Sequence, residues 1–294
     1  LFNKSAVSAL DGVISKVRHN EHNVLKTNNE LTIILDEQKK QARTLDDLHS
    51  KIKDMDKKLT SINREIFGEE PKAEDHLPDA MYAAFEDQFR GRREDIKERQ
   101  RIYLAYIKEV NAGTKEAPVL DLGCGRGEWL ELLKENEFVA EGVDSNSVFI
   151  KMCSELGLDA TESDIIEYFR SQKEKTYGAI TGFHIVEHLP LTDLINLFDE
   201  ALRTLIPGGV VIFETPNPEN IIMGSFYFYR DPSHLKPIVP DTLKFLLEQR
   251  GFVKSIIKRL HPRTEAEYTG NKYIDDIIHS MNMEMDYSVI GYKP

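Results

Sequence analysis

The stretch VLDLGCGRGEWL, residues 119–130, decides the fold of this chain of 294 residues. Its apolar start predicts a short strand, and its end opens a helix-forming run that continues to Lys134. Between them, Gly123, Gly125 and Gly127 are each separated by one residue. A glycine-rich turn between a strand and a helix N-terminus lets backbone N–H groups approach a ligand closely. The stretch therefore predicts a ligand site at the end of a strand.

Two acidic residues narrow the chemistry of that ligand. Asp121 lies just before the glycines, where a carboxylate would repel a phosphate but suits a ligand that carries a cation. The next apolar run, 138–143, leads to Asp144, which is 21 residues beyond Gly123. An acid at that distance and at a strand end is placed to accept hydrogen bonds from ribose hydroxyls. A ligand with a ribose, a cation and no phosphate is S-adenosylmethionine.

Alternating strand and helix patterns after residue 116 predict the rest of the fold. Strands are predicted at 118–122, 138–143, 158–161, 178–184, 208–215, 252–260 and 286–292. Helices are predicted at 127–135, 146–156, 164–173, 191–205, 240–250 and 272–283. Such alternation is typical of an α/β, Rossmann-like fold, in which helices cover both faces of a mostly parallel seven-stranded sheet. The last strand follows a long crossover, so we expect it to be antiparallel.

Ligands of such sheets bind at the carboxyl ends of the strands, near the point where the strand order reverses. That rule gathers the residues that follow the first five predicted strands at one rim. They include Asp121, Asp144, Asp164, His184 and the segment Glu214 to Pro216. We assign the cofactor contacts to these members of the rim and their neighbours: Asp121, Gly123, Gly125, Asp144, Ser145, Asp164, Ile165, Phe183 and His184.

Charge is unevenly distributed along the chain. The 294 residues carry a net charge of −12. Residues 1–66 hold 12 basic and 10 acidic side chains, whereas the remaining 228 hold 26 basic and 40 acidic ones, a net of −14. An acidic body of this kind is a poor match for a nucleic acid backbone, so we expect no nucleic acid partner.

Cysteine content and hydropathy indicate the compartment. A disulfide from Cys124 would distort the glycine loop, so we expect Cys124 and Cys153 to be free thiols in a reducing cytoplasm. No apolar run approaches the ~18 residues of a membrane span, and no signal peptide is visible. The chain starts at Leu1 rather than Met, so we expect a longer parent protein.

One heptad register runs unbroken from Leu10 to Ile66. Its a positions are Leu10, Val17, Val24, Leu31, Gln38, Leu45, Ile52, Leu59 and Ile66, and its d positions are Val13, Asn20, Thr27, Ile34, Gln41, Leu48, Met55 and Ile62. A stripe of this length is typical of a coiled coil. We therefore predict that residues 1–67 form a homo-oligomer, either a dimer or a trimer, because the core positions follow no single rule for strand number. The alternative is a helix packed on the chain's own body.

Residues 68–115 are predicted to link the coiled coil to the body. Gly68, Pro71 and Pro78 among charged residues indicate a hinge over 67–80. Residues 81–110 carry a helical apolar stripe that Gly91 interrupts, so we expect two helical pieces. The α/β body is then predicted to span residues 116–294.

Methyl transfer from a sulfonium to an alcohol needs a base near the methyl group. Candidates come from two polar segments, FHIVEHLP at 183–190 and RDPSHLKP at 230–237. A neutral imidazole suits proton transfer near neutral pH. The candidate catalytic residues are therefore His184, Glu187, His188 and His234. Each histidine could instead have a structural role.

The same four side chains are also candidate ligands of a metal ion. His184, Glu187 and His188 have the i, i+3 and i+4 spacing of one helix face. Because His184 is predicted to end a strand, that shared face is not expected, and we assign no metal ligands.

Six strings together resemble a bacterial group of class I S-adenosylmethionine methyltransferases from surface polysaccharide clusters, which includes O-antigen chain terminators. They are FEDQFRGRREDIKERQRIYLAYI, VLDLGCGRGEWLELL, GVDSN, ITGFHIVEHLP, IPGGVVIFETPNPENI and FYRDPSHLKP, within residues 82–260. By position, Arg90 and Gly91 match the group's FRG element, which implies that Arg90 contacts the cofactor or the acceptor. His234 matches a DPTH-type histidine. Arg92 occupies a position where the group usually has a small polar residue. Arg93 matches the group's pattern better than Arg92 does.

The resemblance implies a class I methyltransferase that uses S-adenosylmethionine to cap the non-reducing end of a lipid-linked glycan. The acceptor atom would belong to a hydroxyl or to a terminal phosphate. The resemblance also implies that the coiled coil spaces this terminator from a polymerising glycosyltransferase and so sets chain length. The expected location is the cytoplasm, or the inner face of the cytoplasmic membrane as a peripheral protein.

Three other functions remain open at this point. The first is a metal-assisted RNA ribose 2'-O-methyltransferase, which can also carry a Glu-His pair after its fourth strand but which the acidic body disfavours. The second is a non-catalytic oligomeric spacer or scaffold, which the intact cofactor motif disfavours. The third is a small-molecule methyltransferase, to which a long coiled coil would be an unusual attachment.

Overall fold

The computed structural model describes residue 51, residues 77–263 and residues 267–294. The chain divides into two units, residues 1–72 and 73–294, and all described residues except Lys51 belong to the second. Apart from Lys51, the predicted coiled coil at 1–67 lies outside the described residues, as does the predicted hinge up to residue 76. The coiled coil and its oligomeric state therefore stay predictions.

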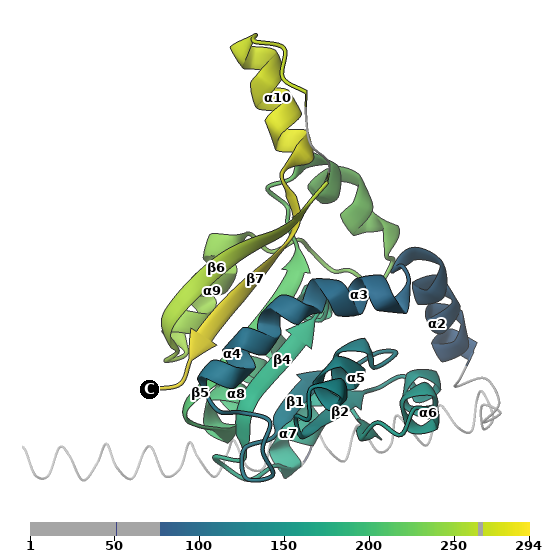
Figure 1. Ribbon diagram of the computed structural model, residues 1–294, viewed down its shortest axis with the longest axis vertical. Helices are drawn as coiled ribbons and strands as arrows, with labels where there is room; N and C mark the ends of the chain where they lie inside the picture. Colours follow the sequence, from purple (N-terminus) through teal and green to yellow (C-terminus); the bar gives the residue numbers. More distant parts are fainter. Residues whose placement is uncertain (1–50, 52–76, 264–266) are drawn as a thin grey trace, which may run out of the picture. The chain divides into compact units, whose positions relative to one another are not determined.

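Seven strands form one sheet in the second unit, in the order β3-β2-β1-β4-β5-β7-β6 (Figure 1). Their bounds are β1 (Val119–Leu122), β2 (Ala140–Asp144), β3 (Ala160–Glu162), β4 (Tyr177–Phe183), β5 (Leu205–Pro216), β6 (Val253–Pro262) and β7 (Glu284–Tyr292). The pairs from β3 to β5 are parallel, and β7 is antiparallel to both of its neighbours. The mostly parallel Rossmann-like sheet and its antiparallel last strand are thus confirmed. The strand order reverses between β1 and β4.

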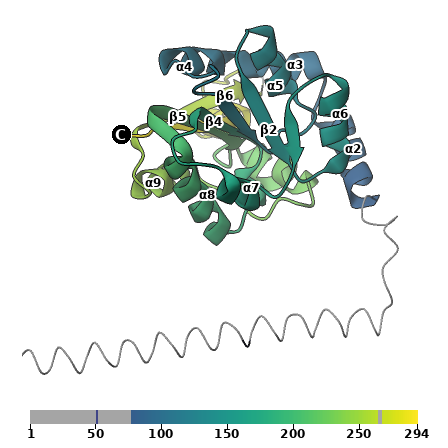
Figure 2. The same cartoon turned by 90° about the horizontal axis from the view of Figure 1, so that it is seen from below.

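Helices cover both faces of this sheet (Figure 2). One face carries α7 (Ile165–Ser171), α8 (Leu191–Thr204) and α9 (Pro240–Gln249), whose apolar sides pack on one core cluster. The other carries α4 (Leu104–Glu109), α5 (Glu128–Glu135) and α6 (Ser147–Glu155), over two smaller clusters. Because both faces are covered, the central strands β1 and β4 are buried along their whole length.

A helical lead-in precedes the first strand. It consists of α2 (Leu77–Phe89), α3 (Arg93–Gln100), the 3-10 turn η1 (Arg101–Tyr103) and α4. Gly91, with φ +104°, separates α2 from α3, which confirms the predicted break. The predicted end of the hinge at residue 80 is wrong, because α2 already begins at Leu77. Pro78 falls in the first turn of that helix, where its missing N–H breaks no intrahelical hydrogen bond.

The other element boundaries lie close to the predicted ones, with one exception in β5. Tyr177 of β4 pairs with Leu205, whereas Ala179 pairs with Val210. Pro207 to Gly209, whose proline and glycines are typical of a turn before a strand, therefore bulge out of β5 rather than precede it. The bulge lies at the end of β5 that is remote from the rim where ligands bind.

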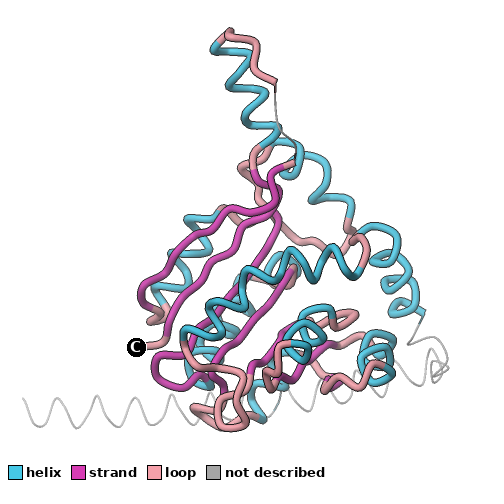
Figure 3. The backbone as a smooth tube through the Cα atoms, viewed as in Figure 1, coloured by secondary structure: helices cyan, strands magenta, loops and turns pink. Residues whose placement is uncertain are grey.

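The connection from β6 to β7 contains α10 (Lys272–Asn282), which projects beyond the sheet (Figure 3). Tyr273, Ile274 and Ile277 of this helix are exposed. Among the described helices, none combines the length and the apolar character that a membrane span requires.

Candidate active site

The glycine loop, residues 123–127, joins β1 to α5. Gly123 has φ +63°, and a Cβ atom at this position would lie 2.9 Å from Ile185 Cδ1. Neither the backbone angle nor the available space admits a side chain there, so the loop needs glycine for its shape. Beneath it, the Cys153 thiol donates a hydrogen bond of 3.5 Å to the Gly125 carbonyl. Cys124 and Cys153 are both buried free thiols, as predicted.

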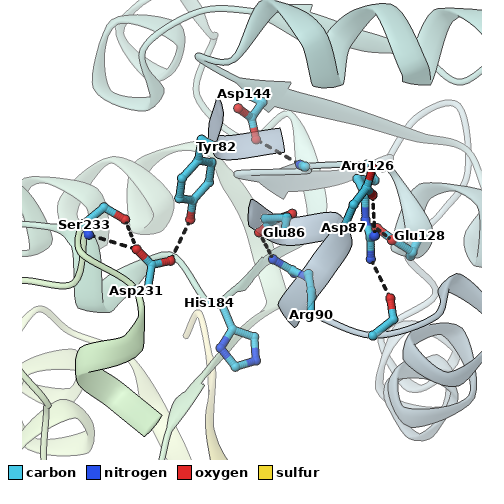
Figure 4. Close-up of polar contacts among 12 residues, drawn as sticks. Tyr82, Glu86, Asp87, Arg90, Arg126, Glu128, Asp144, His184, Asp231 and Ser233 are labelled. Carbon is cyan, nitrogen blue, oxygen red and sulfur yellow. Dashed lines mark hydrogen bonds and ion pairs between the residues drawn. The ribbon is translucent and has the colours of Figure 1, made fainter. Parts of the chain in front are cut away.

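The acids predicted to contact a ligand lie around this loop. The Asp144 carboxylate accepts hydrogen bonds from the backbone N–H groups of Gly125 (2.9 Å) and Asn146 (2.8 Å), as Figure 4 shows for the first. Burial raises the pKa of Asp144. Asp164 follows β3 and caps α7, accepting from the N–H groups of Ile166 and Glu167. Asp144 therefore shapes the glycine loop and stands at the tip of β2.

Asp121 is the most deeply placed of these acids. Its side chain is buried at the end of β1, where the Thr181 hydroxyl donates a hydrogen bond of 2.8 Å to it. Burial raises the pKa of Asp121 to about 8, and the Thr181 hydrogen bond and the charge of Arg90 offset only part of this shift. Without a ligand, Asp121 is therefore mostly protonated at neutral pH.

The helix α2 lies against the glycine loop and brings Glu86 and Arg90 to it (Figure 4). The Arg90 guanidinium donates a hydrogen bond of 2.6 Å to the Glu86 carboxylate. A Cβ atom at Gly125 would be 3.7 Å from Glu86 Oε2, an ordinary contact. Arg90, whose role was implied by the resemblance alone, is thus placed beside the predicted cofactor site.

Two other arginines join the lead-in helices to the loop. Arg126 of the loop donates to Asp87 (2.9 Å) and to the Gly91 carbonyl (3.2 Å). Arg93 donates to the Arg126 carbonyl (2.7 Å) and to Glu131 (2.7 Å). Arg92, by contrast, has an 81% exposed side chain that pairs with Asp95 three residues away. Arg92, the residue that departs from the pattern of the polysaccharide methyltransferases, therefore lies on the surface.

His184 lies one residue beyond β4, with a left-handed φ of +57°. Its Nδ1 atom is 3.3 Å from Glu187 Oε1, and its Nε2 atom is 3.7 Å from Glu214 Oε1 and 3.9 Å from Asp286 Oδ1. Burial alone would lower the pKa of His184, but hydrogen bonds to Glu187 and Glu214 and the charge of Asp286 raise it to about 10. The imidazole is therefore a cation at neutral pH.

His188 and His234 face each other across the rim, with ring centroids 4.7 Å apart. His188 Nδ1 is 3.1 Å from the Ser233 hydroxyl, and burial lowers the pKa of His188. His234 Nδ1 lies 2.6 Å from the Phe228 carbonyl, which can only accept, so this nitrogen carries the proton. The Nε2 atom of His234 is then left as a proton acceptor, 3.8 Å from Asp231 and 3.9 Å from Glu187.

A cavity of about 440 Å³ opens beside these histidines. The Tyr82 hydroxyl of α2 donates to Asp231 (3.0 Å) and so links two of its walls (Figure 4). Aromatic side chains, arginines, a histidine and an acid line it, among them Tyr82, Phe85, Phe89, Arg99, Tyr227, Arg230, His261, Arg263 and Asp286. The histidines 184, 188 and 234 also reach this cavity, so it can hold an acceptor near them.

Known proteins are similar to the chain over most of its second unit. A crystal structure of an S-adenosylmethionine-dependent methyltransferase from Archaeoglobus fulgidus is 35% identical, with a TM-score of 0.64, covering 72% of this chain and 99% of that one. The family described as methyltransferase domain matches residues 95–254, more than half of the chain. The chain belongs to this methyltransferase family. It is therefore an enzyme that uses S-adenosylmethionine, as predicted.

The methyltransferase is also similar to proteins named ubiquinone biosynthesis O-methyltransferase. That of Nitrosomonas europaea is 26% identical over 52% of this chain and 70% of its own length. That of Aliivibrio fischeri is 28% identical over 60% of this chain and 82% of its own length. At the level of the fold alone, a phosphoethanolamine N-methyltransferase of Haemonchus contortus, 16% identical, gives a TM-score of 0.50.

The residues at the first two strand tips of the methyltransferase fit its cofactor. The glycine loop leaves room above Gly125, and the buried Asp121 carboxyl can ionise beside the amino cation of S-adenosylmethionine. Asp144 stands where ribose hydroxyls would donate to it. Ser145, Asp164, Ile165 and Phe183 lie at or directly after the tips of β2, β3 and β4. The structure thus places every predicted cofactor residue at one rim, and their individual roles stay predictions.

The cationic state of His184 changes its expected role in the methyltransferase. It was predicted to end the fourth strand and to serve as a base, but it lies past β4 and a protonated imidazole cannot accept a proton. The cause is the three surrounding carboxylates, of which Glu187 lies three residues away and Glu214 and Asp286 lie on strands much further along the chain. His234, whose Nε2 atom is free to accept, is the better candidate.

Sequence reasoning missed His261 and Asp286, which line the acceptor cavity of the methyltransferase. Both could have been found. An antiparallel last strand must begin at the rim where its parallel neighbours end, so Asp286, near the start of β7, belongs there. His261, near the end of β6, follows from the ordinary rule for strand ends.

Two groups of side chains among the described residues of the methyltransferase could hold a metal ion. They are Glu187, His188 and His234, and His184, Glu214 and Asp286, each with one ligand atom per residue within 4.8 Å of the others. The first contains three of the four predicted metal candidates. The fourth, His184, belongs mainly to the second group.

Proposed function

We propose that this methyltransferase methylates an oxygen atom at the non-reducing end of a lipid-linked surface polysaccharide and thereby terminates the chain. The cavity of about 440 Å³ beside His188 and His234 carries the proposal. Its aromatic side chains can stack on sugar rings, while its arginines and acids can bond hydroxyl groups or a terminal phosphate. The six strings that resemble polysaccharide methyltransferases support the same class of acceptor.

Proton removal from the acceptor is assigned to His234. S-adenosylmethionine supplies an activated methyl group, so the chain's own residues need only align the acceptor and take its proton. The Phe228 carbonyl holds His234 in the tautomer with a free Nε2 atom. Asp231 and Glu187, 3.8 and 3.9 Å from that atom, would stabilise the imidazolium formed by the transfer.

The rest of the chain extends this proposal to partners and location. Residues 1–67 would form a dimeric or trimeric coiled coil that spaces the enzyme from a polymerising glycosyltransferase. The acceptor is lipid-linked, so the enzyme would work in the cytoplasm at the inner face of the cytoplasmic membrane. The net charge of −14 over residues 67–294 supports an acceptor other than a nucleic acid.

A phenolic acceptor is the second candidate. It rests on the similarity to proteins named ubiquinone biosynthesis O-methyltransferase. A phenol is more acidic than a sugar hydroxyl and depends less on a base. The aromatic side chains of the cavity would suit a phenolic ring as well as a sugar.

The two candidates differ in which acceptor takes up label from S-adenosylmethionine. Synthetic glycans with a terminal hydroxyl or phosphate and a catechol-type phenol would be incubated with the full chain and labelled cofactor. Label on the terminal residue of the glycan supports the proposal. Label on the phenol alone would replace it with the second candidate.

The assigned base can be tested in the same assay. His234→Ala should lower turnover by roughly 10²- to 10⁴-fold, the usual contribution of a general base, and leave the dissociation constant of the cofactor nearly unchanged. His279→Ala, on the exposed side of α10, is the matched control. Full turnover of the His234 variant would assign proton removal to another group.

A further inference from the structure

Four side chains that could bind a cation converge at one end of the acceptor cavity. Three of them line the cavity: His184 after β4, His261 of β6 and Asp286 of β7. The fourth is Glu214 of β5, which contacts the two histidines. Glu214 Oε1 lies 3.7 Å from His184 Nε2 and 3.7 Å from His261 Nε2, and Asp286 Oδ1 lies 3.9 Å from His184 Nε2. Ligand atoms of His184, Glu214 and Asp286 thus all lie within 4.8 Å of one another, and His261 joins them through its contact with Glu214.

Two of these groups lack the hydrogen bonds that buried polar atoms normally have. The Asp286 side chain is only 10% exposed, and its carboxylate accepts no hydrogen bond from any residue of the described ranges. His261 Nε2 is buried and has no hydrogen-bond partner among the same residues. A buried carboxylate and a buried ring nitrogen that lack hydrogen bonds beside a cavity indicate a ligand that would satisfy both.

The local charge points in the same direction. Glu187, Glu214 and Asp286 all lie within 4 Å of the single His184 imidazole. Three carboxylates therefore share one imidazole, and a metal ion would add positive charge among them. Buried carboxylates are stable only when they are paired or when they bind a cation.

We propose that His184, Glu214, His261 and Asp286 bind one divalent first-row transition metal ion. Two nitrogen and two oxygen ligands suit ions such as Zn²⁺ and Mn²⁺. Only a neutral imidazole coordinates a metal, so the ion would displace the proton that His184 holds in its absence. Metal–ligand bonds of about 2.0–2.2 Å put neighbouring ligand atoms of a tetrahedral site roughly 3.4 Å apart. Modest side-chain shifts would bring the ligand atoms of His184, Glu214 and Asp286 to that spacing, and a larger shift would bring in His261. Because His184, His261 and Asp286 line the cavity, an oxygen of the acceptor could complete the coordination.

This site differs from the neighbouring group of Glu187, His188 and His234. There, His234 Nδ1 is bonded to the Phe228 carbonyl, His188 Nδ1 to the Ser233 hydroxyl, and Glu187 Oε2 accepts from Thr215. Each member therefore has a protein hydrogen-bond partner, although Glu187 Oε1 itself has none among the described residues. In the proposed site, Glu214 accepts from the Tyr103 hydroxyl, whereas the Asp286 carboxylate has no such partner within the described ranges. Metal binding at the proposed site does not depend on the identity of the acceptor, and only the contact between ion and acceptor rests on the proposed function.

The experiment measures Zn²⁺ and Mn²⁺ binding to the full chain after chelator treatment and removal of the chelator, without cofactor or acceptor. Calorimetry should give one ion per chain for the wild type and for His188→Asn. Asp286→Asn and His261→Asn should weaken binding by about 100-fold or more, since each loses a direct ligand. His279→Asn, on α10, is the surface control and should bind like the wild type.

Thermal unfolding in chelator separates this role from a structural one. Asp286→Asn removes one of three carboxylates that crowd a single imidazole, so it should melt at or above the temperature of the metal-free wild type and gain nothing from added Zn²⁺. The proposal is overturned if the wild type binds no ion, or if Asp286→Asn binds as well as the wild type. It is also overturned if Asp286→Asn melts at a lower temperature in chelator than the metal-free wild type. Loss of the ion in His188→Asn alone would overturn it as well.

Discussion

At the scale of single residues, the buried carboxyl of Asp121 is the feature with the clearest measurable effect. Its pKa of about 8 means that the folded protein holds a proton there which the unfolded chain has already lost. Ionisation inside the protein is unfavourable, so this group lowers stability progressively as the pH rises from about 4 to about 8. A cation bound beside Asp121 lowers the pKa of its carboxyl group and so favours the ionised form.

Cofactor binding should therefore release a proton from Asp121. We expect the affinity for S-adenosylmethionine to rise with pH between 6 and 8, by at most about tenfold per pH unit. Calorimetry in buffers with different ionisation enthalpies would report the number of protons released. Asp121→Asn should abolish the release, and an unchanged proton count in this variant would disconnect Asp121 from the cofactor.

A second residue-scale prediction concerns the shape of the glycine loop. Gly123→Ala should weaken cofactor binding and lower stability by roughly 1–3 kcal/mol, because a left-handed backbone and a contact of 2.9 Å with Ile185 both oppose a methyl group. Gly270→Ala is the matched control, since φ is +83° there and nothing lies within 4 Å of a Cβ atom. If the two variants behave alike in denaturant titrations, crowding by Ile185 is not what requires glycine.

Individual residues also show where sequence reasoning stops. The positions of Asp121, Asp144 and His184 at one rim follow from the rule for parallel sheets, and the structure places them there. The positive charge of His184 could not be predicted from that rule, because Glu214 and Asp286 are 30 and 102 positions further along the chain. The protonation state of a side chain depends on neighbours in space, and a sequence pattern does not show which distant residues these are.

At the scale of elements, the lead-in helices and the glycine loop act as one structure. Arg93→Ala should lower the free energy of unfolding by about 1.5–3 kcal/mol and weaken cofactor binding, because its partly buried guanidinium bonds the Arg126 carbonyl and Glu131. Arg92→Ala removes an exposed pair and should change neither quantity measurably. Urea unfolding and cofactor titration of both variants give the comparison.

The opposite ranking of these two arginines would mean that the lead-in helices are held to the body in another way. Equal small effects would mean that Arg126, through Asp87 and Gly91, carries the connection without Arg93.

Most elements could be predicted from periodicity and glycine placement. The seven strands and the helices between them were foreseen because each combines an apolar pattern with a turn signal. The bulge in β5 was not, because Pro207 to Gly209 reads as a chain reversal. Only the pairing with β4, which continues on both sides of it, shows that the strand carries on.

At the scale of the whole molecule, the first 72 residues and the rest form separate units. Removal of residues 1–72 should leave a monomeric body that still binds S-adenosylmethionine, because the glycine loop and all its described contacts lie beyond residue 72. Analytical ultracentrifugation and calorimetry of the shortened chain would test this. An unchanged oligomer would show that the heptad pattern is not what joins the copies.

The thiols of Cys124 in the glycine loop and of Cys153 beside it have a practical consequence. Cys124 and Cys153 are buried, so an alkylating reagent can reach them only when the loop opens. A ligand that holds the loop shut would slow that reaction, and the rate of thiol modification would then report loop opening in the unmodified protein. The enzyme thus carries its own chemical probe of cofactor occupancy, which needs neither a fluorescent label nor a known acceptor.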